Sequence, residues 1–133
     1  GDPVFDKLDA DIAKAMMSIG AVKAVEIGAG IRAPKMTGFE NNDQILPDGF
    51  QTNHSGGILA GISSGDDIIA RVHVKPIPSI LKSQQTIDEK GGSTEISTKG
   101  RHDICAIPRI NKVCEAMLAI VLTDHLLRQK ILD

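Results

Sequence analysis

The stretch PRINKVCEAMLAIVLTDHLLRQKIL, residues 108–132, constrains the fold of this 133-residue chain more than any other part. Its apolar residues recur every three or four positions, which predicts one long helix. A helix that is apolar on most sides is expected to be buried against two layers or against another subunit. The stripe holds Ile110, Val113, Met117, Ile120, Val121, Asp124, Leu127 and Ile131, and Leu118, Leu122 and Leu126 widen it.

Residues 3–19 predict a second, amphipathic helix with Asp and Lys on its outer face. Asp2 is suited to be its N-cap, Pro3 to be its first helical residue, and Gly20 to end it. Residues 21–28 then predict a short strand. The apolar face of the predicted helix is formed by Phe5, Leu8, Ile12, Met16 and Ile19.

The middle of the chain predicts strands and turns. Residues 29–49 are rich in Gly, Pro, Asn and Asp and indicate a long surface loop. Residues 68–74 alternate, with Arg71 and His73 on one face and Val72 on the other, as in a half-buried strand. Two prolines follow it, and residues 82–98 predict a hairpin that turns at Gly91-Gly92.

Composition excludes several classes of protein. Apolar residues make up 41% and charged residues 24%, which is ordinary for a soluble globular domain. A net charge of −2 argues against nucleic-acid binding through bulk electrostatics. No apolar run approaches the ~20 residues needed to span a bilayer, and no signal peptide is visible. We expect one domain over residues 1–133, cytoplasmic in location because two cysteines are too few for a disulfide scaffold.

A metal site is not expected. Cys114 and His125 are eleven residues apart on one predicted helix, which separates them by roughly 16 Å. That distance is too long for both to bind one ion, and Cys105 has no ligand spacing with either. His54, His73 and His125 are each expected to be structural, and no partner for His125 is evident from the sequence.

Three short motifs favour an anionic, phosphorylated ligand when taken together. GGILAGISSG matches neither the Walker nor the Rossmann pattern, but its small residues allow close backbone approach to a ligand. KPIPSI places Lys75 and Ser79 on a rigid proline frame, and GRHD adds the guanidinium of Arg101. Each motif has a structural alternative: a tight turn, a solvated lysine, and a salt-bridged loop before a helix, respectively.

Nearly the whole chain resembles the carboxy-terminal part of chorismate synthases, most specifically in TNHSGGI, in GRHD, and in EAMLAIVL followed after one residue by DHLLRQ. The resemblance implies an α+β fold, part of a β-α-β sandwich in which antiparallel sheet packs on helices. It implies a lyase of the shikimate pathway that converts 5-enolpyruvylshikimate 3-phosphate into chorismate and phosphate. Such enzymes require reduced FMN, some reduce it with NADPH, and their subunits form homotetramers.

The resemblance also assigns residues. Asp103 matches an aspartate implicated in proton traffic near the flavin N5, and Arg101 matches an arginine that touches flavin and substrate. Two departures are Ala60 and Ile104, where the family usually has glycine and proline. The implied flavin-binding positions are Gly20, Ala21, Ala60, Lys75, Pro76, Ile77, Pro78, Ser79 and Arg101.

The family's two catalytic histidines lie in an amino-terminal part that this sequence does not contain. We therefore expect the chain to be a piece of a longer protein and to be inactive by itself. The competing interpretation is a non-catalytic assembly module, in which the terminal helix mediates association and the glycine-rich turns bind no ligand.

Overall fold

The structure is a computed structural model that describes residues 1–132. Its elements form an α+β fold with antiparallel strand pairs, as expected. In chain order they are α1 (Leu8–Met17), β1 (Val22–Ile27), η1 (Gly30–Lys35), α2 (Gly38–Asn41), β2 (Ile45–Leu46), β3 (Gly49–Phe50), β4 (Ile58–Leu59), β5 (Ile62–Ser63), β6 (Ala70–Val74), β7 (Gln84–Ile87), β8 (Ser93–Ile96) and α3 (Ile107–Leu132).

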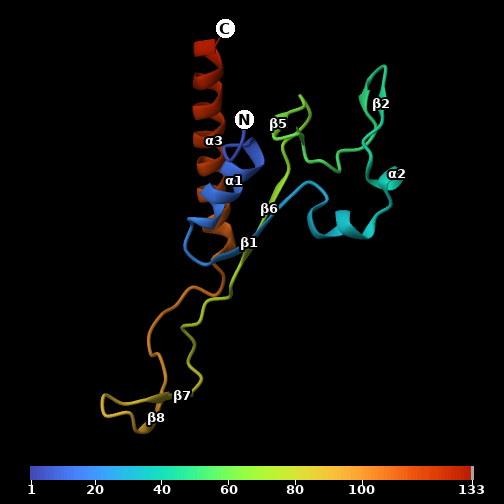
Figure 1. The fold of residues 1–133 in the computed structure, drawn as a ribbon. Helices are drawn as coiled ribbons and strands as arrows, with labels where there is room; N and C mark the ends of the chain where they lie inside the picture. Colours follow the sequence, from blue (N-terminus) through green and yellow to red (C-terminus); the bar gives the residue numbers. More distant parts are fainter. Residues whose placement is uncertain (133) are drawn as a thin grey trace.

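The long terminal helix is confirmed as α3, and α1 packs along it (Figure 1). Between them lies a small core built on Ile12 and Met16, which are almost fully buried. The sequence predicts that α3 is buried on two sides, but within this chain only one side of α3 is covered. Cys114, Met117, Leu118, Val121 and Leu122 pack on the core, whereas Ile120, Leu127 and Ile131 leave 63%, 56% and 83% of their surface exposed.

The predicted start of the first helix is wrong. Helix α1 begins at Leu8, its N-cap is Lys7, and Phe5 is 87% exposed. Asp2 does not cap it, because its carboxylate instead lies 3.4 Å from the Arg128 guanidinium on α3. The free N–H of Leu8 is satisfied by the Gly61 carbonyl at 2.8 Å, so a tertiary contact decides where the helix begins.

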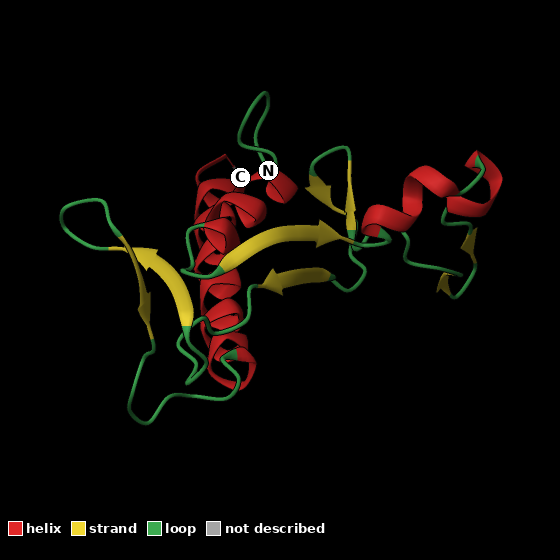
Figure 2. Ribbon diagram, turned by 90° about the horizontal axis from the view of Figure 1, so that it is seen from below, coloured by secondary structure: helices red, strands yellow, loops and turns green. Residues whose placement is uncertain are grey.

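The two predicted strands around residues 21–28 and 68–74 are confirmed as β1 and β6, which pair antiparallel. Val25 lies opposite Val72 and Ile27 opposite Ala70, with an irregularity between Val22 and Ala24. Along β6 the half-buried and exposed residues alternate, as the sequence pattern predicts. This pair crosses the helical layer (Figure 2) and carries one loop cluster at each end.

The hairpin over residues 82–98 is also confirmed. Strands β7 and β8 pair with Thr86 opposite Thr94, and the Asp88 carboxylate closes the turn by accepting the N–H groups of Lys90 and Gly92. Figure 1 shows the hairpin extending away from the helices on two extended connections. A two-stranded ribbon is marginally stable alone, so its position depends on what those connections contact.

The prediction of a plain loop over residues 29–49 is wrong, since the segment holds η1, α2 and the β2–β3 pair. Helix α2 is fixed by a capping box: the Thr37 hydroxyl accepts from the Glu40 N–H, and Glu40 accepts from the Thr37 N–H at 2.7 Å. The Glu40 carboxylate accepts from the Thr37 N–H and also from the Thr37 hydroxyl at 2.9 Å, and these two hydrogen bonds, the backbone one first, lower the pKa of Glu40. Local polar side chains thus build structure in a segment that has little apolar pattern.

The chain leaves an unusually large surface. Its accessible area is 9883 Å², whereas a compact protein of 14.2 kDa exposes about 6,800 Å². The extra exposed area comes from the exposed side of α3, from the extended β7–β8 hairpin, and from residues 29–51, called the excursion below, which run through η1 and α2 away from the core. Within residues 1–132, no helix has the length and apolarity needed to cross a lipid bilayer.

Candidate functional site

Two of the motifs singled out in the sequence meet at one cavity. The connection before β7 and the connection after β8 run together below the helices (Figure 1). They line an open hollow of about 370 Å³, at the lower end of the size typical of small-molecule sites. Its lining residues are Ile77, Ser79, Ile80, Leu81, Gly100, His102, Asp103 and Ile104.

The KPIPSI segment places alternate residues on two sides. Ile77 and Ser79 are half-buried and line the hollow, whereas Lys75, Pro76 and Pro78 are exposed. The backbone N–H of Lys75 donates to the Ala21 carbonyl at 2.9 Å. The Gly20-Ala21 turn therefore adjoins the start of this segment, and the structure brings together two stretches that are more than fifty residues apart.

The GRHD segment contributes unequally. Gly100, His102 and Asp103 line the hollow, but Arg101 does not, and it makes no ion pair within the described residues. Asp103 accepts a 2.7 Å hydrogen bond from Arg109 in the first turn of α3. This is the geometry of the salt-bridged loop that was the structural alternative for GRHD. Both side chains are at least half exposed, so the pair contributes under about 1 kcal/mol and leaves Asp103 displaceable.

Ala60 lies apart from this hollow. It sits in the turn between β4 and β5 and lines a separate depression of about 390 Å³ with Lys7, Gly61 and the first four residues. Figure 1 places β5 near the amino terminus and the hairpin connections beyond the opposite end of β6. Within the described chain, the implied flavin-binding positions therefore form two clusters rather than one.

Each of the two clusters contains one alanine with a positive φ angle. Ala21 and Ala60 have φ values of 75° and 52°, and they are the described non-glycine residues with positive φ. That region is unfavourable for a residue with a Cβ atom. Strain of this kind persists only where surrounding structure imposes it, and it is frequent at functional sites. Both strained alanines stand at positions where the resemblance implies backbone contact with a flavin.

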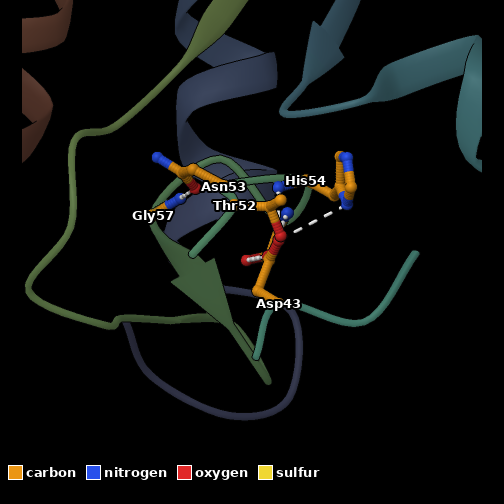
Figure 3. Close-up of polar contacts among 6 residues, drawn as sticks. Asp43, Thr52, Asn53, His54 and Gly57 are labelled. Carbon is orange, nitrogen blue, oxygen red and sulfur yellow. Dashed lines mark hydrogen bonds and ion pairs between the residues drawn. The ribbon is translucent and has the colours of Figure 1, made fainter. Parts of the chain in front are cut away.

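A third polar cluster was not anticipated from the sequence. Asp43, from the excursion, reaches the loop of residues 52–57 (Figure 3). One of its oxygens accepts from the Thr52 hydroxyl at 2.6 Å and the His54 N–H at 2.7 Å. The other accepts from the Ser55 N–H at 2.8 Å and the Ser55 hydroxyl at 2.6 Å. The dense Asn, Asp and Ser content of residues 41–55 was the available signal, because such side chains bond nearby backbone.

The protonation of Asp43 is fixed by these contacts. Burial acts to raise the pKa of this carboxyl, but hydrogen bonds from Ser55, Thr52 and the backbone of residues 54 and 55 outweigh it. They hold the pKa far below its ordinary value, so Asp43 is ionised at neutral pH. His54 Nδ1 faces the same carboxylate at 3.5 Å, too long for a hydrogen bond, and has no other polar partner among the described residues.

The rest of this loop is fixed by Asn53 and by glycine packing. Asn53 donates to the Asp67 carbonyl at 2.8 Å and accepts from the Gly57 N–H at 2.7 Å. A Cβ atom on Gly56 would come within 2.4 Å of the Gly28 backbone nitrogen. Only glycine permits this approach, and it lets the loop join the end of the β1–β6 pair.

The remaining histidines pair with carboxylates. His73 Nε2 lies 2.6 Å from Glu26 Oε1 across the β1–β6 pair, and His125 Nε2 lies 3.0 Å from Asp11 Oδ2. These contacts fit the structural roles expected of both residues, and Asp11 is the partner that the sequence did not reveal. In residues 1–132, no three His, Cys, Asp or Glu side chains are grouped so as to hold a metal ion.

The donor set at the first hollow fits a phosphate-bearing flavin in part. Ser79 offers a hydroxyl, and Lys75 and Arg101 are exposed cations on the flanking segments, with no ion pair to other described residues. Ile77, Ile80 and Leu81 supply an apolar wall for a ring system. The hollow is open and one-sided, so these residues form a wall and not an enclosed pocket.

Comparison with known proteins gives consistent findings. A family model described as chorismate synthase matches residues 1–127. A chorismate synthase of Desulfosudis oleivorans is 71% identical over 130 residues, which cover 98% of this chain and 37% of that protein. One from Desulfatibacillum aliphaticivorans is 67% identical over 97% of this chain and 36% of its own length. A crystal structure of chorismate synthase aligns with a TM-score of 0.69 and 37% identity, over 92% of this chain and 31% of that one. The chain therefore spans little more than a third of the relatives it matches.

Proposed function

This chain belongs to the chorismate synthase family, and from that premise we propose that it forms part of the wall of a site for reduced FMN and 5-enolpyruvylshikimate 3-phosphate. The reaction is a 1,4-elimination that yields chorismate and phosphate, and it makes the intact protein a lyase. The observation that carries the proposal is the shared cavity of residues 77–81 and 100–104, two segments that the β7–β8 hairpin separates in sequence.

The chain's own residues have distinct roles in this proposal. Lys75 and Arg101 offer fixed positive charge to the phosphate groups of substrate and flavin, and a guanidinium keeps its proton at any physiological pH. Ser79 donates a hydrogen bond, and the Gly20-Ala21 turn approaches the flavin through backbone beside it. Ala60 offers its backbone to a flavin at its own depression, apart from this hollow. Pro76, Ile77 and Pro78 hold this segment rigid. Bound reduced FMN supplies transient electron density as phosphate departs.

Asp103 is the proposed catalytic residue, and it holds or moves a proton near the flavin N5. Its exposed ion pair with Arg109 is weak enough to be exchanged for a contact with ligand. Arg101, beside it, compensates the negative charge that accumulates when an anionic flavin and a phosphorylated substrate meet.

We further propose that the described segment is the carboxy-terminal portion of a homotetrameric, cytoplasmic enzyme, and that it is inactive alone. Its coverage of 37% of the Desulfosudis oleivorans relative supports the inactivity of the segment alone, because most of that protein has no counterpart here. Incubation with reduced FMN and substrate is the test. Phosphate release at enzyme-like rates would show that the segment is sufficient for catalysis.

The second candidate is a non-catalytic assembly module. It is favoured by the exposed side of α3, where Ile120, Leu127 and Ile131 form an apolar stripe, and by the excess surface of the chain. In this case the glycine-rich turns bind nothing, and the strained alanines have a purely structural cause.

A titration with reduced FMN, followed by fluorescence and calorimetry, separates the two candidates. We expect saturable binding that weakens about tenfold in Lys75→Ala and in Arg101→Ala, the effect of one charge-assisted contact. Lys90→Ala, at the hairpin tip, and Arg32→Ala, in η1, are matched controls that should bind as the unmodified chain does. Absence of saturable binding would leave only the assembly module.

A further inference from the structure

The Asp43 carboxylate joins two parts of the chain. It belongs to the excursion of residues 29–51, yet all four of its short hydrogen bonds come from residues 52–55 (Figure 3). Its side chain is only 5% exposed. The donors are two hydroxyls and two backbone N–H groups, and no Lys or Arg side chain approaches the carboxylate among the described residues.

This arrangement requires an anion and not merely a polar side chain. Four donors converge on two oxygens, and a carboxylate accepts at every one of these positions. An amide of the same shape would turn an NH₂ group toward two of the donors, leaving them unsatisfied in a site that water scarcely reaches. The negative charge of Asp43 therefore satisfies four donors of residues 52–55 that a neutral side chain of this shape would not.

The ordered loop leads directly to one of the proposed flavin contacts. His54 accepts from the Ala29 N–H at 2.6 Å, and Gly56 accepts from the Ile69 N–H at 3.1 Å, which joins the loop to the ends of β1 and β6. Ile58 follows, buried in the core against α1. Two residues later comes Ala60 in its strained conformation, and the next carbonyl, that of Gly61, accepts from the first N–H of α1.

We propose that Asp43 is a positioning residue: its carboxylate is a built-in anion that holds the loop of residues 52–57 and thereby sets the backbone conformation of Ala60. The role of Ala60 toward flavin rests on the proposed function, but the positioning itself does not. Asp43 touches no reacting group and acts only through the loop.

Amide hydrogen exchange measured by NMR tests this without any flavin. In Asp43→Ala we expect two amides to exchange at least about tenfold faster: that of Ser55, and that of Leu8, which donates to the Gly61 carbonyl next to Ala60. The amide of Thr86 in the distant hairpin should be unchanged. Asp48→Ala, which removes an exposed carboxylate from the same excursion, is the matched control and should change none of them.

Small anions distinguish charge from packing. Sodium formate should restore slow exchange to Asp43→Ala, because formate fits the vacated position and supplies two anionic oxygens. It should not restore Asp43→Asn, whose side chain still fills that position, and sodium chloride at equal ionic strength should restore neither. An equal response of both variants to formate, or slow exchange in Asp43→Asn without it, would overturn the proposal.

A milder variant covers the case in which Asp43→Ala fails to fold. Thr52→Val removes one of the four donors and keeps the shape of the side chain, so it should speed exchange of the Ser55 and Leu8 amides by a smaller factor. If the Ser55 amide exchanges faster while the Leu8 amide is unaffected, Asp43 orders the loop but does not position the turn that holds Ala60, and the inference fails. In a flavin titration, Asp43→Ala should bind FMN more weakly although Lys75 and Arg101 are both still present. If the unmodified chain binds no FMN, that result counts against the proposed function alone.

Discussion

Replacing Ala60 by glycine is expected to stabilise the chain, although such a change destabilises most positions. Ala60 has a φ of 52° and an exposed side chain, so its methyl group contributes little packing and forces an unfavourable backbone conformation. Glycine adopts this conformation freely.

The magnitude follows from two opposing effects. A Cβ atom in the left-handed region costs about 1 to 2 kcal/mol. Glycine gives back about 0.4 to 1 kcal/mol because it increases the entropy of the unfolded chain. The net gain is about 0.5 to 1 kcal/mol, which corresponds to a rise in Tm of about 2 to 4 °C for a chain of this size.

The assay is urea unfolding followed by circular dichroism at the helical band, with Ala13→Gly as the matched control. Ala13 lies inside α1, where the same substitution should cost about 0.5 to 1 kcal/mol. The two variants should therefore shift the urea midpoint in opposite directions. Equal destabilisation by both would refute the argument that Ala60 is strained.

Three further predictions concern the core and the loop. Gly56→Ala should abolish the native loop or lower the free energy of unfolding by about 3 kcal/mol or more, because its Cβ would meet the Gly28 backbone at 2.4 Å. Gly65→Ala, whose Cβ has no neighbour within 4 Å, should lower it only by the positive-φ penalty of about 1 to 2 kcal/mol, and thermal unfolding compares the two variants. Ile12→Ala should lose about 3 kcal/mol in urea titration, and Leu127→Ala, 56% exposed, under about 1 kcal/mol; similar losses would contradict the burial of Ile12. The folded-state pKa of Asp43 is depressed, so the stability that its charge contributes should be complete above the ordinary pKa of 3.8 and be lost as pH falls through the folded value. The difference in free energy of unfolding between the unmodified chain and Asp43→Asn should therefore be constant from about pH 5 to 8 and shrink below about pH 4.

Local pattern was sufficient for several elements. The terminal helix, the β1 and β6 strands and the β7–β8 hairpin follow from periodicity and turn chemistry, which depend on neighbouring residues alone. The excursion was less predictable because its order comes from polar contacts. The Thr37–Glu40 capping box is local and was readable in principle, whereas the Asp43 contacts span nine to twelve residues and leave no periodic trace.

The candidate site divides in the same way. Motif chemistry predicted that Ser79 and the GRHD segment adjoin an anionic ligand; the structure brings both segments to one cavity, while the ligand stays a prediction. It gave no means of knowing that Ala60 lies at the other end of β6, or that Lys75 and Arg101 flank the cavity without lining it. The distance between Ala60 and the cavity depends on how β6 and the hairpin connections are directed in space.

The sequence by itself determined that the segments of α1, α3, β1, β6 and the β7–β8 hairpin are helical or extended, because those preferences arise within a few residues of chain. Tertiary structure alone decided where α1 begins, which side of α3 is covered, and that one carboxylate organises the glycine loop. The physical reason is that hydrogen-bond partners and buried neighbours are supplied by residues distant in the chain: the carbonyl of Gly61 for Leu8, the core of α1 for α3, and Asp43 for residues 52–55.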